Sequence, residues 1–380
     1  MKYKSLLLSI TLASLLIGCG SDDNQGLGVI PNKEALGDSL YHDTSLSANQ
    51  TMSCATCHSL EEGLIDPRTT SKNLGASLGD DGTSIGDRNA PTAGYASFSP
   101  DFHFDAAEGL FIGGQFLDGR ALDLKTQAKG PFLNPIEMGM PDIASVLARV
   151  QENASYVSQF KAIYGTDIFD DEVKAYNALA DAISVFERSQ AFAAFDSKYD
   201  RFLAGEYTLS AAEARGLVLF VDEGPGGAMC SACHPAVAND SKPLFTDFSY
   251  DNLGVPINNA LRTANGQTGI NDVGLYGNID VNDTDLQGSF KVSSLRNIAV
   301  TGPYMHNGLF KDLKTVVHFY NTRDSGGINP ETNSTWETGE FHALRNVDEL
   351  GNLGLSDAQE DDIVAFLKLL TDKKYEHLIP

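Results

Sequence analysis

Cysteine is scarce in this chain of 380 residues, and its placement excludes a fold held together by disulfides. The sequence contains five cysteines: Cys19 lies near the start, and the other four lie in two short motifs, so none remains for a disulfide. Long apolar runs are missing as well. The run over residues 6–17 is too short to cross a bilayer, and no other segment is long and apolar enough to do so.

Basic residues are also few, because 27 Lys and Arg stand against 51 Asp and Glu, for a formal net charge of −24. This excess of negative charge argues against nucleic acid as a partner, since binding to phosphates depends on Lys and Arg. An acidic surface suits a basic or neutral protein partner. Solubility alone is an equally good explanation of the charge.

The first nineteen residues have the organisation of an export signal. Lys2 and Lys4 precede the apolar run, and residues 16–19 (Leu-Ile-Gly-Cys) resemble the lipobox of bacterial lipoproteins. This predicts a lipoprotein signal peptide over residues 1–19 and a flexible tether over 20–31. A lipid on Cys19 would anchor the protein to the periplasmic side of a bacterial membrane or to the cell surface. A plain signal peptide with a chance cysteine is the alternative.

One five-residue motif occurs twice, as Cys54-Ala-Thr-Cys57-His58 and as Cys230-Ser-Ala-Cys233-His234. Two thiols three residues apart and followed at once by a histidine are the attachment signature of c-type haem. The thiols add to the haem vinyl groups, and the imidazole becomes the proximal ligand of the iron. A single match could be a zinc half-site or a redox dithiol. Two complete copies predict two covalently bound haems.

The rest of the chain predicts a mainly α fold with long loops. Apolar residues recur three and four apart over residues 143–164 and 171–195, and capping signals precede helices that end near residues 221 and 370. Glycine-rich and polar loops over residues 61–88 and 239–288 follow the two haem motifs. Strand-like alternation is rare.

Two blocks of sequence repeat in the same order as the haem motifs. Residues 118–126 align without a gap with residues 307–315, and residues 181–186 (Asp-Ala-Ile-Ser-Val-Phe) echo residues 361–366 (Asp-Asp-Ile-Val-Ala-Phe). We interpret this as the duplication of a haem domain. The sequence therefore predicts two tandem cytochrome c-like domains, over residues 32–205 and 206–380.

The register of the repeat distinguishes the two irons, because it places Pro131 opposite Tyr320. In a haem domain, the helix after the long loop normally carries the sixth ligand to the iron. Proline has no side-chain donor, so the first iron is expected to be open or water-bound, whereas Tyr320 offers a phenolate. A core tyrosine, or Met305 as the ligand, is the alternative. The first haem is then expected to do chemistry and the second to store electrons.

Two polar side chains near Pro131 suit peroxide chemistry. Gln127 lies four residues before it and Glu137 six residues after it. Splitting a peroxide O–O bond requires moving a proton from the inner oxygen to the outer one, which suits a carboxyl group in a dry pocket. We expect Glu137 to move this proton. A solvated helix-cap residue is the alternative.

Four further segments carry a resemblance to a known family. The segments are residues 89–92, 114–120, 130–138 and 295–306, and their order and spacing around two haem motifs resemble the bacterial di-haem cytochrome c peroxidases and their MauG-type relatives. The resemblance covers roughly residues 32–370. It implies that Glu137, Gln127 and Pro131 form the peroxide pocket.

The resemblance also implies metal ligands outside the two motifs. It implies that the side chain of Asn89 and the carbonyls of Thr301 and Pro303 hold a calcium ion between the domains. Tyr320 lies seventeen residues after Pro303, where the peroxidases carry a methionine and the MauG type a tyrosine. His306 is expected to contact a haem edge or a propionate.

Three departures from the family pattern qualify the resemblance. No histidine lies between His58 and His103, so the loop histidine that caps the resting peroxidatic haem in many peroxidases is missing, and no reductive activation is expected. Leu117 stands in place of the tryptophan between the haems. Ala228 stands where the MauG type has a surface tryptophan that passes oxidising equivalents to its protein substrate.

Two other residues have open interpretations. His103, flanked by aromatic residues, is either a group of the distal pocket or a core histidine, and we favour the core. Trp336 is the single tryptophan and lies in a polar loop, where it is a redox relay or a surface residue.

Together these features predict a di-haem c-type oxidoreductase that activates hydrogen peroxide at the His58 haem. In a peroxidase, a small cytochrome c or cupredoxin would supply electrons through the His234 haem. In a MauG-like enzyme, the oxidising equivalents would be used on side chains of a partner protein. A non-catalytic electron carrier is the alternative of another class, and it would need both irons six-coordinate.

Overall fold

The computed structural model describes residues 32–236 and 242–380, so the predicted signal peptide, its tether and Cys19 lie outside the described residues. Residues 31–380 form one compact unit. Helices dominate it, which confirms the predicted fold class. The helices are α1 (Lys33–His42), α2 (Cys54–Cys57), α3 (Thr69–Leu74), α4 (Leu124–Gln127), α5 (Gly130–Leu133), α6 (Ile143–Glu152), α7 (Ala154–Tyr164), α8 (Glu172–Phe186), α9 (Lys198–Leu203), α10 (Ala211–Val221), α11 (Asn259–Ala264), α12 (Leu313–Thr322) and α13 (Asp357–Lys368).

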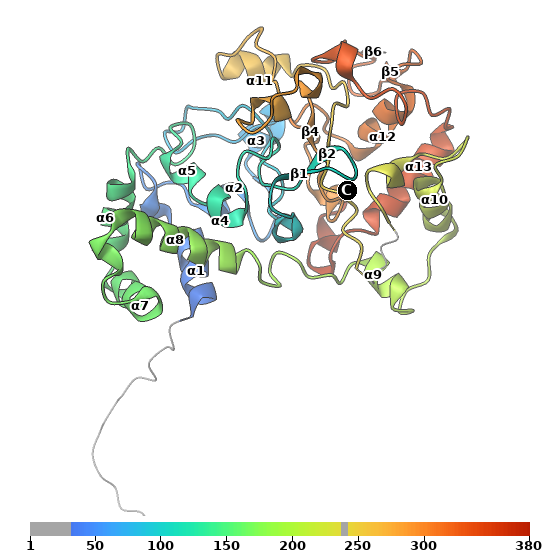
Figure 1. Cartoon of the computed structure of the whole chain (residues 1–380). Coiled ribbons are helices and arrows are strands. Elements are labelled where there is room, and N and C mark those ends of the chain that lie inside the picture. The colour runs from blue at the N-terminus through green and yellow to red at the C-terminus, as the bar shows by residue number, and fades with distance from the viewer. Residues whose placement is uncertain (1–31, 237–241) are drawn as a thin grey trace, which may run out of the picture. The chain divides into compact units, whose positions relative to one another are not determined.

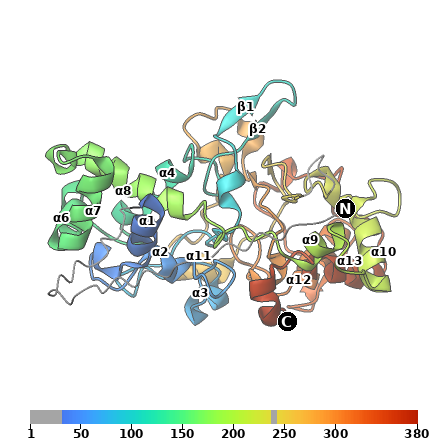
Figure 2. The same cartoon turned by 90° about the horizontal axis from the view of Figure 1, so that it is seen from below.

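The strands are short and form antiparallel pairs only. In the described part of the chain they are β1 (His103–Asp105) with β2 (Leu110–Ile112), β3 (Tyr250–Asp251) with β4 (Phe290–Lys291), and β5 (Ile328–Asn329) with β6 (Ser334–Thr335). Figure 2 shows the β1–β2 hairpin at the edge of the molecule, away from the helices. None of the helices among the described residues is both long and apolar enough to span a bilayer.

Two large hydrophobic cores lie within the described residues, one for each haem motif. The first core is built from buried residues between Leu36 and Phe192, and the second from buried residues between Tyr199 and Leu370. Figure 1 accordingly shows α1, α6, α7 and α8 on one side and α10, α12 and α13 on the other. The boundary at residues 205 and 206 remains a prediction, although it falls just after the second core begins.

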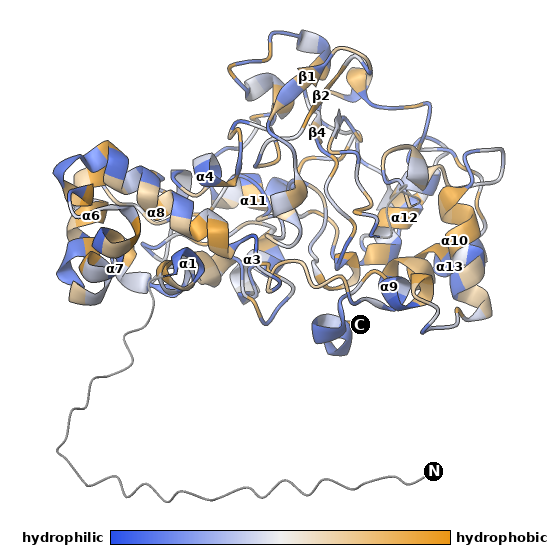
Figure 3. Ribbon diagram, turned by 60° about the horizontal axis from the view of Figure 1, so that its bottom comes forward, coloured by the Kyte–Doolittle hydropathy of each residue, from blue (hydrophilic) through white to orange (hydrophobic). Residues whose placement is uncertain are grey.

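Each of the two cores contains a crossing of two helices at which a glycine lets the backbones approach closely. A Cβ on Gly37 of α1 would lie 2.0 Å from the carbonyl oxygen of Ala182 in α8, and a Cβ on Gly216 of α10 would lie 1.9 Å from that of Asp362 in α13. Only glycine permits such a close approach of two helix backbones. Ala182 and Asp362 are matching positions of the repeated block, so the two crossings agree with the predicted duplication. Figure 3 shows the apolar α10 lying beside α13.

The predicted helices differ from the observed ones mainly at their ends. The periodic segment 143–164 is two helices, because Asn153 caps α7 by accepting hydrogen bonds from the backbone N–H groups of Ser155 and Tyr156. The segment 171–195 is helical only to Phe186. The long polar loop 239–288 contains α11 and β3. A polar capping residue, Asn153, thus divides the first periodic segment into two helices.

The repeated block of residues 118–126 and 307–315 starts a helix in each half, and the two helices then differ. Asp123 caps α4 by accepting a hydrogen bond from the N–H of Thr126 at 2.7 Å, and Asp312 caps α12 by accepting one from the N–H of Lys314 at 2.6 Å. The α12 helix continues to Thr322, whereas α4 ends at Gln127. Pro131 follows in the first turn of α5, where its missing N–H is tolerated. The first half therefore has a break where the second half presents Tyr320.

Candidate di-haem site

Both haem motifs form a helical turn. The N–H of His58 donates to the carbonyl oxygen of Cys54 at 2.9 Å, and the N–H of His234 donates to that of Cys230 at 2.8 Å. Because residues three apart lie on one face of a helical turn, the two thiols of each motif are expected to share a face. This is the arrangement that attachment of a haem by two thioether bonds requires.

A backbone carbonyl orients each proximal histidine. The Nδ1 atom of His58 lies 3.3 Å from the carbonyl oxygen of Leu64, and Nδ1 of His234 lies 2.7 Å from that of Phe245. Burial lowers the pKa of both histidines, so the imidazoles are held neutral. With Nδ1 bonded to a carbonyl, Nε2 is left to bind a metal. Leu64 and Phe245 both have positive φ angles, 61° and 54°, so each half uses a left-handed residue to present this carbonyl.

A cavity of about 320 Å³ lies at the second motif. Cys230, Cys233 and His234 line it, and so do Tyr320 and Met305. The wall is mostly apolar with a few polar groups, as expected for a cofactor site. The residues present therefore fit a covalently attached haem, and both candidates for its sixth ligand face the same space.

Tyr320 lies on α12 and lines the same cavity as Cys230, Cys233 and His234. Burial is the main cause that raises the pKa of its phenol well above the ordinary value, and the thiols of Cys233 and Cys230 raise it further. A phenol in such a place ionises only if a cation replaces its proton, as a ferric iron would. Ligation by Tyr320, rather than by Met305, remains a prediction.

Pro131 and Glu137 lie in one turn near the first motif. The carbonyl of Pro131 accepts a hydrogen bond from the N–H of Met138 at 3.2 Å, which folds the chain back over residues 131–138. The Nδ2 group of Asn134 donates to Oε1 of Glu137 at 2.9 Å. Burial raises the pKa of Glu137. Burial is also the main cause that raises the pKa of Cys54 and of Cys57, the latter to about 11, and the charge of Glu137 makes a smaller contribution to both. The carboxyl group is therefore partly dry and close to the first pair of thiols, rather than a solvated helix cap.

Gln127 is the third predicted residue of this pocket. It is the last residue of α4, partly buried, and its backbone N–H donates to the carbonyl of Asp123 at 2.9 Å. Only Ala128 and Lys129 separate it from α5, so the structure places it next to the turn that carries Pro131.

Comparison with known proteins identifies this arrangement. Residues 31–208 match the family model described as di-haem cytochrome c peroxidase. The MauG protein of Paracoccus denitrificans, named for methylamine utilization, is 45% identical over 357 residues, which cover 91% of this chain and 90% of that protein. The chain belongs to the di-haem cytochrome c peroxidase and MauG family. Two c-type haems and a peroxidase-class oxidoreductase follow from this membership.

Other members of the family are similar over most of their length. The cytochrome c551 peroxidase of Pseudomonas aeruginosa is 29% identical over 77% of this chain and 72% of that protein. The crystal structure of the di-haem peroxidase BthA from Burkholderia thailandensis has 30% identity and a TM-score of 0.83, covering 95% of this chain and 91% of that one. The family resemblance predicted from the sequence is thus confirmed, and so is the fold.

The residues predicted to hold calcium in this di-haem protein meet between the two halves. The Nδ2 group of Asn89 donates to the carbonyl oxygen of Pro303 at 2.6 Å, and the backbone N–H of Asn89 donates to the carbonyl of His306 at 2.7 Å. Thr301 lines the same cavity as Asn89 and Pro303. The three residues offer oxygen atoms, which calcium prefers. The ion itself remains a prediction.

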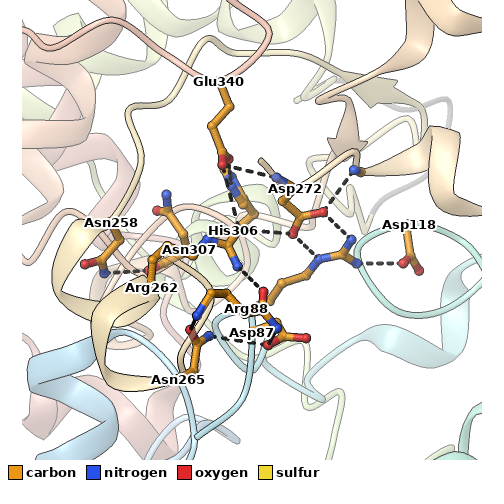
Figure 4. Close-up of polar contacts among 12 residues, drawn as sticks. Asp87, Arg88, Asp118, Asn258, Arg262, Asn265, Asp272, His306, Asn307 and Glu340 are labelled. Carbon is orange, nitrogen blue, oxygen red and sulfur yellow. Dashed lines mark hydrogen bonds and ion pairs between the residues drawn. The ribbon is translucent and has the colours of Figure 1, made fainter. Parts of the chain in front are cut away.

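A buried network of charges joins the halves beside these residues (Figure 4). Arg88 donates from Nη1 to Asp118 at 2.7 Å and from Nε and Nη2 to Asp272, both at 2.6 Å. Burial acts to raise the pKa of Asp272, but the hydrogen bonds and charge of Arg88 outweigh it and lower the pKa to about 2. Arg262 lies 3.8 Å from Glu340 and 4.0 Å from Asp272. No local pattern predicts this network, because Arg88 and Asp272 are 184 residues apart in the sequence.

Three minor predictions have different outcomes. His306 lines the cavity, stacks on Phe290 at 3.7 Å and lies 3.3 Å from Glu340, so its expected contact with a haem is still a prediction. His103 is not a core residue: it is exposed, because the β1–β2 hairpin turns it to solvent. Trp336 is half-buried against the second core, where its Nε1–H donates to Thr322 at 3.0 Å.

Two carboxylates that lie together near the second motif could not be predicted from the sequence. Asn346 donates from Nδ2 to Asp251 at 2.7 Å and to Glu349 at 2.6 Å. Both carboxylates lie within 4.8 Å of the thiol of Cys233. Burial raises the pKa of Asp251. Glu349 is three residues from Asn346, but Asp251 lies in another segment, so no local pattern pointed to the group.

Proposed function

We propose that this protein reacts with hydrogen peroxide at the haem held by Cys54, Cys57 and His58. The observation that carries the proposal is the half-buried carboxyl group of Glu137, fixed by Asn134 in the turn of Pro131 and electrostatically coupled to the first pair of thiols. The haem supplies the iron that coordinates peroxide and exchanges electrons with it.

In this proposal the surrounding residues prepare the site and move the proton. Pro131 contributes no side-chain donor, which leaves the distal side free for peroxide. Glu137, whose pKa is raised by burial, carries a proton from the inner to the outer peroxide oxygen. Gln127, the last residue of α4, has a neutral amide that would donate a hydrogen bond to peroxide and hold it in place.

The second haem, held by Cys230, Cys233 and His234 and ligated by Tyr320, would pass the electrons. A small electron-donor protein, a cytochrome c or a cupredoxin, would reduce it in a cytochrome c peroxidase reaction. The acidic charge of the chain suits a basic donor of this kind.

Oxidation of side chains on a partner protein is the second candidate function. Two observations favour it: Tyr320 faces the cavity of the second motif, and the relative with 45% identity is a MauG protein. Ala228, in place of a surface tryptophan, means that any partner would have to receive its oxidising equivalents by another route.

One assay tests the proposal and separates the two versions. Peroxide consumption is measured with a reduced small cytochrome as donor, and in parallel with candidate partner proteins followed by mass spectrometry for oxidised side chains. Turnover with the cytochrome supports the peroxidase, and peroxide-dependent modification of a partner supports the MauG-like enzyme. If peroxide is not consumed under either condition, the electron carrier replaces both.

Calcium and the lipid anchor belong to the same proposal. We infer a calcium ion bound by Asn89, Thr301 and Pro303, and we expect Asn89→Ala to abolish calcium retained after gel filtration, as measured by metal analysis. We also infer export and attachment to a membrane through Cys19, facing the periplasm. Cys19→Ala should release the protein into the soluble fraction, and continued membrane association of that variant would remove the anchor.

A further inference from the structure

Lys291 is a lysine on the wall of the second haem cavity without a charged partner. It is the last residue of β4, and among the described residues that line the cavity it is the single Lys or Arg. Its ammonium group donates to Oγ of Ser99 at 2.5 Å and to the carbonyl oxygen of Gly114. It also lies 5.4 Å from the centre of the Phe248 ring. None of these groups carries a negative charge.

The acidic residues that line the cavity do not pair with the ammonium group of Lys291. Asp251, Glu340 and Glu349 line the same cavity, and none of them lies within 4.0 Å of the Lys291 ammonium group among the ion pairs of the described residues. Burial accordingly lowers the pKa of Lys291 to about 7. A buried ammonium group is costly unless an anion lies beside it. The haem that belongs in this cavity carries two propionate groups, which are such anions.

The backbone of Lys291 bonds to a segment of the first half of the chain. Its N–H donates to the carbonyl oxygen of Leu117 at 2.9 Å, while its ammonium group donates to the carbonyl of Gly114. Both carbonyls belong to residues 114–117 of the first half of the chain, and residues 115–117 of this segment line the cavity. One residue of the second half therefore holds this segment at both ends.

We propose that Lys291 binds a propionate of the haem attached to Cys230 and Cys233, and that it thereby fixes residues 114–117 against that haem. Lys291 is a cofactor-binding and positioning residue in this proposal. The proposal depends on the second haem, which follows from family membership, and not on the site at which peroxide reacts.

A positive charge beside a haem favours the reduced iron, because reduction lowers the charge of the haem by one unit. Lys291→Gln removes the positive charge and should lower the midpoint potential of the second haem. Lys291→Arg keeps the charge and should have a midpoint potential close to that of the parent protein. Lys311→Gln is the matched control. Lys311 also donates to a backbone carbonyl, that of Gly308 at 2.5 Å, but it does not line the cavity.

Potentials are measured by spectroelectrochemistry without peroxide, after haem content has shown that both haems are attached. The proposal is overturned if Lys291→Gln and Lys311→Gln give the same potential for the second haem. A measurement on the unaltered protein covers the case in which Lys291→Gln does not fold. Resonance Raman spectra of the second haem in H₂O and D₂O should show a shifted propionate bending band, and a band that does not shift contradicts the proposal.

Discussion

The two halves of the molecule share the helix crossing and the contact of the proximal histidine, and they differ in the segment that follows the capped helix start. Gly37 and Gly216 allow the same close helix crossing, and Leu64 and Phe245 present the same carbonyl to the proximal histidine. After the capped helix start, the second half continues as α12, whereas Pro131 follows a break in the first. In our proposal, this single interruption of a helix is what distinguishes the reactive iron from the electron-storing one.

The largest effect is expected from removing the acid of the first half. Glu137→Gln keeps the shape of the side chain but cannot carry the proton, so the reaction with peroxide should slow by about 10²–10⁴-fold, the usual contribution of a positioned acid–base group. Stopped-flow absorption with both haems attached measures this rate. A variant that reacts at the parent rate would show that Glu137 is a structural residue.

Glu187 offers the matched control for that substitution. It is also buried, its Oε2 atom has no hydrogen-bond partner within the described residues, and burial raises its pKa to about 8. Burial is the main cause that raises the pKa of Cys54; the charge of Glu187 raises it further, and that of Glu137 contributes less. Glu187→Gln should leave the peroxide rate within a few-fold of the parent, so an equal loss in both variants would point to general disturbance of the first haem.

The next effect concerns the network that joins the halves. Arg88→Met leaves Asp272 without its forked partner, whereas Asp118 keeps its ion pair with Arg120. Loss of one member of a buried pair costs about 3–5 kcal/mol of unfolding free energy. Denaturant unfolding measures it. Arg88→Lys, which keeps the charge but loses the forked contact, should be affected less.

The same network predicts an acid dependence of stability. The pKa of Asp272 is about 2 in the folded protein, below its ordinary value of 3.8, so its stabilising contribution is present above about pH 4 and is lost as the pH falls towards 2. In Arg88→Met this part of the acid sensitivity should disappear. If the free energy of unfolding falls by the same amount between pH 4 and pH 2 in the parent and in the variant, the role of Arg88 is contradicted.

A smaller, spectroscopic effect is expected at the second haem. Tyr320→Phe should open the sixth position and change the spin state of that iron, while the first iron keeps its signal. A phenolate stabilises ferric over ferrous iron, so the potential of the second haem should rise when it is lost. Unchanged electron paramagnetic resonance in Tyr320→Phe, together with a change in Met305→Leu, would transfer the ligand role to Met305.

The smallest effect should come from the segment between the haems. Leu117 lines the cavity and accepts a hydrogen bond from the backbone of Lys291. Leu117→Trp supplies an aromatic relay and should speed electron equilibration between the haems, as followed by flash photolysis, while peroxide binding stays unchanged. Leu117→Phe is the matched control for size, and equal rates in all three proteins would rule out a limit at this position.

The sequence predicted the features that depend on neighbouring residues. The two haem motifs, the capped starts of α10 and α13, and the pairing of Pro131 with Tyr320 could all be read from local patterns and one repeat. The network around Arg88 and the contacts of Lys291 could not, because their partners come from distant segments. His103 was assigned to the core from its aromatic neighbours, but a three-residue strand in an exposed hairpin decides its environment.

The central claim is that peroxide reacts at the first iron and that the second is closed by Tyr320. Electron paramagnetic resonance of the fully oxidised, untreated protein, before and after one equivalent of peroxide, tests it most directly. We expect two distinct ferric signals at the start and an immediate reaction with peroxide without prior reduction. The signal of the first iron is the one that Tyr320→Phe leaves unchanged. Peroxide should alter this signal in the parent protein, and should do so much more slowly in Glu137→Gln. An oxidised protein that is inert to peroxide, or one that reacts as fast in Glu137→Gln, would contradict the account.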